Sequence, residues 1–288
     1  MLKDKYKLRI IKVRRKVAMK PKFARVTQES SEKLKVLKGH RYDPSKHNIT
    51  GWWVSEKLDG MRAYWNGDRL VTGGGKPINA PDWFIEPLRK STNHLDGELF
   101  AGRGNFQDVV SACRKNRPRD NEWRQITYQV FDAPNHTAPF ASRYEKIIDI
   151  ISGMITDHVQ VVIHEPIVGD LDKMLSMYEE KGAEGLMIRN PTSYYEYGRS
   201  STILKHKSFL DADATVVGIQ AGGGKHEGRM GAIICELDNG KRFKIGTGFS
   251  DRQRENPPEV GDRIIFKYFE LTRSGTPRFP AYVGVRGD

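Results

Sequence analysis

The 288-residue sequence has few cysteines and no long apolar run, and these absences exclude several classes of protein. Its two cysteines, Cys113 and Cys235, lie far apart and lack the spacing of zinc ligands, so neither a disulfide scaffold nor a zinc site is expected. No apolar stretch approaches the roughly 20 residues of a membrane-spanning helix, and the basic N-terminus lacks the apolar core of a secretory signal. We therefore expect a soluble intracellular protein without membrane contacts.

Acidic residues are scarce at one end of the chain. Residues 1–41 contain 15 Lys or Arg and three acidic residues, so this segment carries the whole net charge of +12 and the rest of the chain is balanced. A basic arm on a neutral body predicts contact with a polyanion, because such arms commonly bind phosphate backbones without reading sequence. A solvated tail and a targeting sequence are the alternatives.

The chain has neither internal repeats nor low-complexity tracts, and its length suits two domains. Between about residues 50 and 209, short strand signals alternate with helical ones. Asn66-Gly67, between Arg62–Trp65 and Arg69–Thr72, predicts a hairpin. Further strands are expected at 51–58, 94–100, 126–131, 159–164, 184–188 and 201–206, and helices at 81–90, 105–115, 142–153 and 170–181.

The pattern changes after Phe209. Five short strands are separated by Gly, Asn-Gly and Pro, at 211–219, 231–237, 242–245, 263–269 and 281–285. This spacing favours a small five-stranded β-barrel. We expect a basic arm over residues 1–41, a first domain over 42–209 and a second over 210–288.

A lysine that could carry a nucleotide follows the first strand of the first domain, in Glu56-Lys57-Leu58-Asp59-Gly60-Met61-Arg62. At the end of a strand, Lys57 would point into a cleft, and a deprotonated lysine amine is a nucleophile for a metal-bound phosphate. Taken alone, Lys57-Leu58-Asp59-Gly60 also fits a surface turn, because Asp-Gly is a common turn pair.

Four further segments supply the rest of a nucleotide site. They are Asp96-Gly97-Glu98-Leu99-Phe100, Tyr128-Gln129-Val130-Phe131-Asp132, Glu184-Gly185-Leu186-Met187-Ile188-Arg189 and Leu204-Lys205-His206-Lys207. Glu98 and Glu184 are hard oxygen ligands suited to Mg²⁺ beside phosphates. Lys205 and Lys207 would neutralise charge on an α-phosphate, and Phe131 offers a flat face to a base. Each residue alone has a structural explanation, but the ordered set does not.

These five segments resemble the covalent nucleotidyltransferase superfamily of ligases and capping enzymes, and within it the small ATP-dependent DNA ligases of viral and bacterial type. The resemblance runs from about Trp53 to Arg286. It implies an α+β protein: a nucleotidyltransferase (adenylation) domain of antiparallel sheets with flanking helices, followed by a small OB-fold β-barrel. It also implies sealing of 3′-OH/5′-phosphate nicks in duplex DNA, in repair, replication or recombination.

The resemblance assigns a role to each site residue. Lys57 would attack the α-phosphate of ATP, hold AMP as a phosphoramidate and pass it to the 5′-phosphate of a nick, after which the 3′-hydroxyl displaces AMP. Glu56 and Asp59 would lie at the nucleotide, with Asp59 on the ribose side, and Arg62 would hold the nucleotide or the nick phosphate. Glu98 and Glu184 would bind Mg²⁺ or Mn²⁺, Phe131 would stack on adenine, and Lys205 and Lys207 would contact phosphate during catalysis.

Nicked duplex DNA is the expected partner of a monomer, with no protein partner predicted. The expected DNA contacts come from both domains: Arg62, Lys76, Lys225, Arg229, Arg278 and Arg286. One departure from the family concerns Gly73, which stands where a nick-contacting arginine is usual. Lys76 or Arg69 would substitute for it, although a lysine lacks the bidentate fork of arginine.

Three alternatives remain open from the residues, and a fourth does not fit them. A capping guanylyltransferase would share the lysine chemistry but use GTP, and an RNA ligase would act on nicked RNA. A nucleic-acid-binding module without activity would form no covalent adduct. An NAD⁺-dependent ligase would resemble a family with an additional upstream domain and a four-cysteine zinc site, which this sequence does not match.

Overall fold

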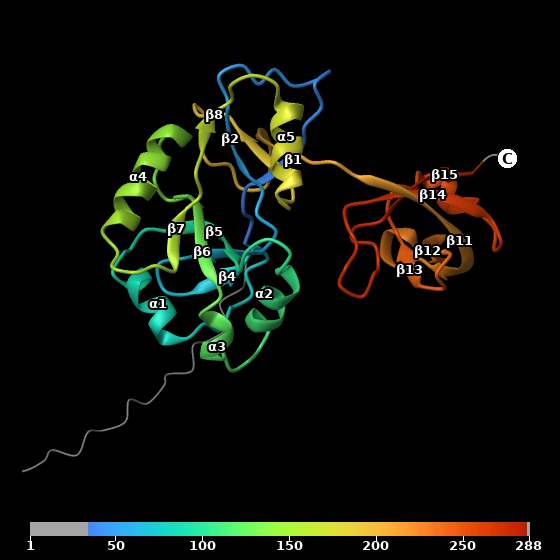
Figure 1. The fold of residues 1–288 in the computed structure, drawn as a ribbon, viewed down its shortest axis with the longest axis horizontal. Coiled ribbons are helices and arrows are strands. Elements are labelled where there is room, and N and C mark those ends of the chain that lie inside the picture. Colours follow the sequence, from blue (N-terminus) through green and yellow to red (C-terminus); the bar gives the residue numbers. More distant parts are fainter. Residues whose placement is uncertain (1–33, 287–288) are drawn as a thin grey trace, which may run out of the picture. The chain divides into compact units, whose positions relative to one another are not determined.

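The computed structural model describes residues 34–286, which form three five-stranded sheets with short helices (Figure 1). The expected basic arm falls almost entirely on residues 1–33, outside the described part of the chain. No helix among the described residues has both the length and the apolar character needed to span a membrane.

The first sheet has the order β1-β10-β9-β2-β8. Only its β1–β10 pair is parallel. The helix α5 (Leu171–Glu180) begins at Asp170, whose carboxylate accepts two backbone N–H groups as an N-cap, and its Leu171 and Leu175 pack on the sheet. The strands are β1 (Lys38–Arg41), β10 (Arg199–His206), β9 (Leu186–Arg189), β2 (Trp53–Glu56) and β8 (Glu165–Pro166).

The second sheet has the order β4-β3-β5-β6-β7, and only its β6–β7 pair is parallel. Its main core contains the fully buried Trp65, Phe84 and Trp123, which come from a strand and two helices. Its strands are β4 (Leu70–Thr72), β3 (Met61–Trp65), β5 (Leu95–Phe100), β6 (Thr127–Asp132) and β7 (Val159–Val161), with α1 (Asp82–Arg89), α2 (Phe106–Cys113), α3 (Asp120–Trp123) and α4 (Phe140–Ser152).

The third sheet lies in the C-terminal part, in the order β13-β12-β11-β14-β15, with every pair antiparallel. A single parallel bridge joins Thr247 to Ala281, but among the described residues no strand ladder joins β13 to β15 to close a barrel. Its elements are β11 (Leu210–Ala221), η1 (Gly224–His226), β12 (Met230–Glu236), β13 (Arg242–Ile245), α6 (Asp251–Glu255), β14 (Arg263–Tyr268) and β15 (Ala281–Val285).

Most expected elements are present with shifted ends. The hairpin turn forms at Asn66-Gly67, where Gly67 has a φ of 90° and the Asn66 side chain accepts the N–H groups of Asp68 and Arg69. The sequence pattern did not predict β1, β8, α3 and α6, which are short. The four residues of β1 fall within the segment expected to be an arm and pair with β10. β10 ends at His206 and β11 begins at Leu210, on either side of the predicted domain boundary, and the division itself stays a prediction.

Candidate active site

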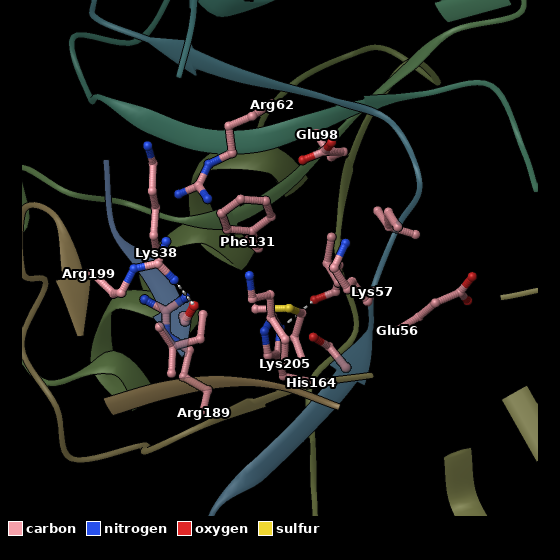
Figure 2. Close-up of a pocket in the computed structure, with 16 residues that line it drawn as sticks. Lys38, Glu56, Lys57, Arg62, Glu98, Phe131, His164, Arg189, Arg199 and Lys205 are labelled. Carbon is pink, nitrogen blue, oxygen red and sulfur yellow. Dashed lines mark hydrogen bonds between the residues drawn. The ribbon is translucent and has the colours of Figure 1, made fainter. Parts of the chain in front are cut away.

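A cavity of about 260 Å³ lies between the first and second sheets and collects most of the expected nucleotide residues. Figure 2 shows Arg62 and Phe131 on one side of it and Lys205, His164 and Arg189 on the other. The expected residues in its lining are Glu56, Lys57, Arg62, Glu98, Phe131 and Lys205. Asp59, Glu184 and Lys207 are outside the lining. Glu184 nevertheless accepts a hydrogen bond from Lys57, and Lys207 donates one to the same glutamate.

Lys57 sits in the segment that crosses from the first sheet to the second. Its backbone N–H donates to the carbonyl of Gly185 at 2.8 Å, which fixes it at the end of β2. Gly60 then passes so close to β5 that a Cβ there would lie 2.2 Å from the carbonyl oxygen of Leu99. A side chain at residue 60 would therefore displace the crossing, which explains the glycine in Lys57-Leu58-Asp59-Gly60.

Glu184 holds two lysines at once. Its Oε2 accepts a hydrogen bond from Nζ of Lys57, and its Oε1 accepts one from Nζ of Lys207 at 3.0 Å. The Glu184 side chain is only 6% exposed, so this shared ion pair is shielded from water. Gly185 follows with a φ of +144°, and a Cβ there would lie 2.6 Å from the carbonyl oxygen of His206. The glycine after Glu184 is thus required by the close approach of the chain to His206 and Lys207.

The opposite wall comes from the second sheet. Arg62 and Glu98 are partners across β3 and β5, so their side chains share one face. Nε and one Nη of Arg62 donate to the buried carboxylate of Asp96, at 2.7 and 2.5 Å, and Tyr195 Oη donates to the same carboxylate at 2.6 Å. The guanidinium of Arg62 lies 4.8 Å from the ring centroid of Phe131. These contacts fix both the cation and the aromatic face.

Burial and neighbouring charges shift the pKa values of two groups in the cavity, Glu98 and Lys205. Burial raises the pKa of Glu98 to about 8, against the opposing effect of Arg62 and Lys57. Burial also lowers the pKa of Lys205, and the charges of Lys57 and Arg199 lower it further. The cavity therefore gathers positive charge beside a carboxyl group that stays largely neutral below pH 8, an arrangement suited to an anion.

Several lining residues had not been expected. They include Lys38 and Arg199 from β1 and β10, His164 from the loop after β7, and Arg189. Arg189 and Arg143 share the fully buried carboxylate of Asp132; although burial raises the pKa of Asp132, the two guanidinium groups hold it below its ordinary value. Arg103, also unexpected, donates two hydrogen bonds to Glu56, at 2.9 and 2.8 Å.

The expected DNA contacts are spread over the surface. Lys76 and Lys225 are exposed. Arg229 pairs with Asp251 at 3.0 Å, and Arg286 pairs with Asp213 at 2.5 Å. Arg278 pairs with Glu270 and, at 2.6 Å, with Asp59. Asp59, which was expected to contact the nucleotide, is therefore held by an arginine outside the cavity lining. Only Arg62 also lines the cavity, and the assignment of all six to DNA stays a prediction.

Comparison with known proteins identifies the architecture. The DNA ligase of Haemophilus influenzae is 37% identical over 236 residues, covering 81% of this chain and 86% of that protein. The chain belongs to the DNA ligase family. Residues 221–286 also match the family model of a DNA ligase OB-like domain, which confirms the expected character of the C-terminal part, although the described ladders leave its sheet open.

Other DNA ligases are similar to this chain as well. A solved structure from a structure–function study of Lig E DNA ligases superposes with a TM-score of 0.80 at 34% identity, covering 88% of this chain and 99% of the other. Chlorella virus DNA ligase–adenylate gives a TM-score of 0.50 at 26% identity, covering 88% and 99%. DNA ligase 2 of Methanosarcina acetivorans is 26% identical, and the match spans 76% of this chain but 44% of that longer protein.

Proposed function

We propose that this ligase seals nicks in duplex DNA with ATP, through AMP held covalently on Lys57. The observation that carries the proposal is the position of Lys57 in the cavity, held by Glu184 and faced by Lys205, Arg62 and Phe131. Family membership supports the overall reaction, and the Chlorella virus relative, which is a ligase–adenylate, supports the intermediate.

The reaction consists of three successive transfers. Nζ of Lys57 attacks the α-phosphorus of ATP, a P–N bond forms, the bond to pyrophosphate breaks and the amine proton leaves. An oxygen of the nick 5′-phosphate next attacks the same phosphorus and releases the lysine. The 3′-hydroxyl finally loses its proton and attacks the 5′-phosphorus, so that the phosphodiester forms, the bond to the adenylate breaks and AMP leaves. Lys205 and Lys207 stabilise the charge that develops on the phosphate oxygens.

Glu98 and Glu184 would hold Mg²⁺, or Mn²⁺, beside the phosphates, and the bound cation would favour the ionised form of Glu98. Among residues 34–286 no group of three or more potential protein ligands gathers around one point. This fits a magnesium ion, because Mg²⁺ is commonly bound by one or two carboxylates together with waters and substrate phosphates. When bound, the ion would neutralise phosphate charge. Glu184 itself orients the amine of Lys57.

The test is labelling with α-³²P-ATP, α-³²P-GTP and Mg²⁺, comparing wild type with Lys57→Ala. Lys173→Ala, which removes an exposed lysine on α5, is the matched control. We expect label from ATP on wild type and the control, none on Lys57→Ala, and release of label during a chase with nicked DNA. Label from GTP alone would favour a capping enzyme, closure of nicked RNA alone would favour an RNA ligase, and no label would contradict catalysis.

A further inference from the structure

His164 lines the cavity but has no part in the three transfers proposed above. It lies in the loop between β7 and β8 and is 8% exposed. Its backbone N–H donates to Tyr144 Oη at 3.1 Å, and its ring packs edge-on against Phe140 and Tyr144, with centroids 5.0 and 5.1 Å apart. Contacts on this many sides fix the orientation of the ring.

The hydrogen bonds of His164 determine its tautomer. Nδ1 lies 2.9 Å from the carbonyl oxygen of Val162, which can only accept, so Nδ1 carries the proton. Burial and the charge of Arg189 lower the pKa of His164 to about 4, so the ring is neutral near pH 7. Nε2 therefore has a free lone pair, and none of the hydrogen bonds described among residues 34–286 involves it.

The cavity is lined by both charged and apolar side chains. Lys57, Lys205 and Arg62 supply the positive charge that a triphosphate requires, whereas Phe131, Val162 and Met187 supply apolar faces for a flat base. His164 lies two residues after Val162 and lines the same cavity, on the side of Lys205 and Arg189 and opposite Phe131 (Figure 2). A base held against Phe131 would occupy the cavity that the free acceptor of His164 also lines.

We propose that Nε2 of His164 accepts a hydrogen bond from the 6-amino group of adenine and thereby selects adenine over guanine nucleotides. Guanine has a carbonyl oxygen at this position, which would face the lone pair and leave two acceptors opposed. A buried acceptor left without a donor is costly, so the selection corresponds to roughly 5- to 50-fold in affinity. This inference rests on the proposed use of ATP by the same cavity.

The experiment compares initial rates of Lys57 labelling with ATP, GTP and the triphosphate of purine riboside, which is adenosine without its 6-amino group. Wild type should favour ATP over the purine nucleotide by roughly 5- to 50-fold in kcat/KM, mainly through KM. His164→Phe keeps a ring but removes the acceptor, so the ratio should fall to near one. His164→Gln supplies a carbonyl acceptor and should recover part of it.

His158→Phe is the matched control, because His158 stacks on Phe84 at 4.7 Å and is outside the cavity lining; its ratio should equal that of wild type. Equal rates with ATP and the purine nucleotide in wild type would overturn the inference without any variant. An unchanged preference in His164→Phe would also overturn it. Absence of label from every nucleotide would instead contradict the proposed function, so the two failures are distinguishable.

Discussion

Charged side chains are buried to different extents in residues 34–209 and in residues 210–286. Around the cavity, charged groups are buried and shared: Asp132 lies between Arg143 and Arg189, and Asp96 holds Arg62. In the OB-like part, the described ion pairs Arg229–Asp251, Arg263–Asp238 and Arg286–Asp213 each include at least one half-exposed side chain, and Arg254 is the one buried charged residue described there.

This difference indicates two tasks. Buried, multiply bonded charges have one arrangement, because breaking it leaves an uncompensated charge away from water, and a reaction centre needs such fixed geometry. Exposed pairs contribute little to stability, so an arginine can exchange its carboxylate for a DNA phosphate at small cost. Under the proposed function, the first part would hold the reacting groups and the second would offer cations to DNA.

The largest expected effect is on the rate of AMP transfer, and it distinguishes a residue of the first part from one of the second. Glu184→Gln should lower the rate of AMP transfer to Lys57 by about 100-fold or more, because the lysine loses a preorganised partner. Arg229→Ala should leave that rate unchanged while weakening binding to nicked DNA. Labelling rates and DNA titrations on both variants check this, and a matching loss of labelling in Arg229→Ala would break the comparison.

The next effect concerns stability. Asp132→Ala leaves two buried guanidinium groups without a carboxylate and should lower the free energy of unfolding by about 3–5 kcal/mol. Asp213→Ala removes the partner of Arg286 from an exposed pair and should cost at most about 1 kcal/mol. Urea denaturation of the nucleotide-free proteins measures both, and equal losses would show that burial does not distinguish the two kinds of pair.

A smaller effect depends on pH through Glu98. Its pKa is raised from 4.5 to about 8, so the protonated form is favoured by folding. This contribution to stability is fully present below about pH 4.5 and is lost as the pH rises towards 8. Glu98→Gln cannot ionise, so its melting temperature should exceed that of wild type by a few degrees more at pH 8.5 than at pH 5. A constant difference would contradict the raised pKa.

The smallest expected effect concerns the basic arm. Deleting residues 1–20, which contain much of its positive charge, should weaken binding to nicked DNA several-fold at moderate salt and flatten the dependence of log Kd on log salt concentration. Adenylation without DNA should not change. A deletion that leaves the salt slope intact would show that the arm does not contact phosphates.

The parts that were predictable from sequence are those specified by neighbouring residues. Lys57, Glu98, Phe131 and Lys205 each belong to a short ordered segment, and the cavity brings them together. Strands such as β13 and β15 showed clear alternation between turn signals. The basic residues of β1 led to its assignment to the arm, whereas the structure pairs this segment with β10.

The unpredicted residues depend on contacts between distant segments. Arg103 reaches Glu56 from 47 positions away, and Asp132 meets Arg189 across 57 positions. His164 gave no signal of its own, because one histidine in a strand-like stretch reads as an ordinary core residue. Its position in the cavity becomes visible only once the loop after β7 is placed beside β6 and β9.

The most direct test of the account uses the adenylated protein alone. Protein carrying labelled AMP is freed of ATP and mixed with an equal amount of nicked duplex DNA and Mg²⁺. We predict that one nick closes for each AMP bound, that free AMP appears in the same amount, and that Lys57 is left unmodified. Closure that still requires added ATP, or loss of AMP without closure, would contradict a lysyl-AMP intermediate on the path to the sealed strand.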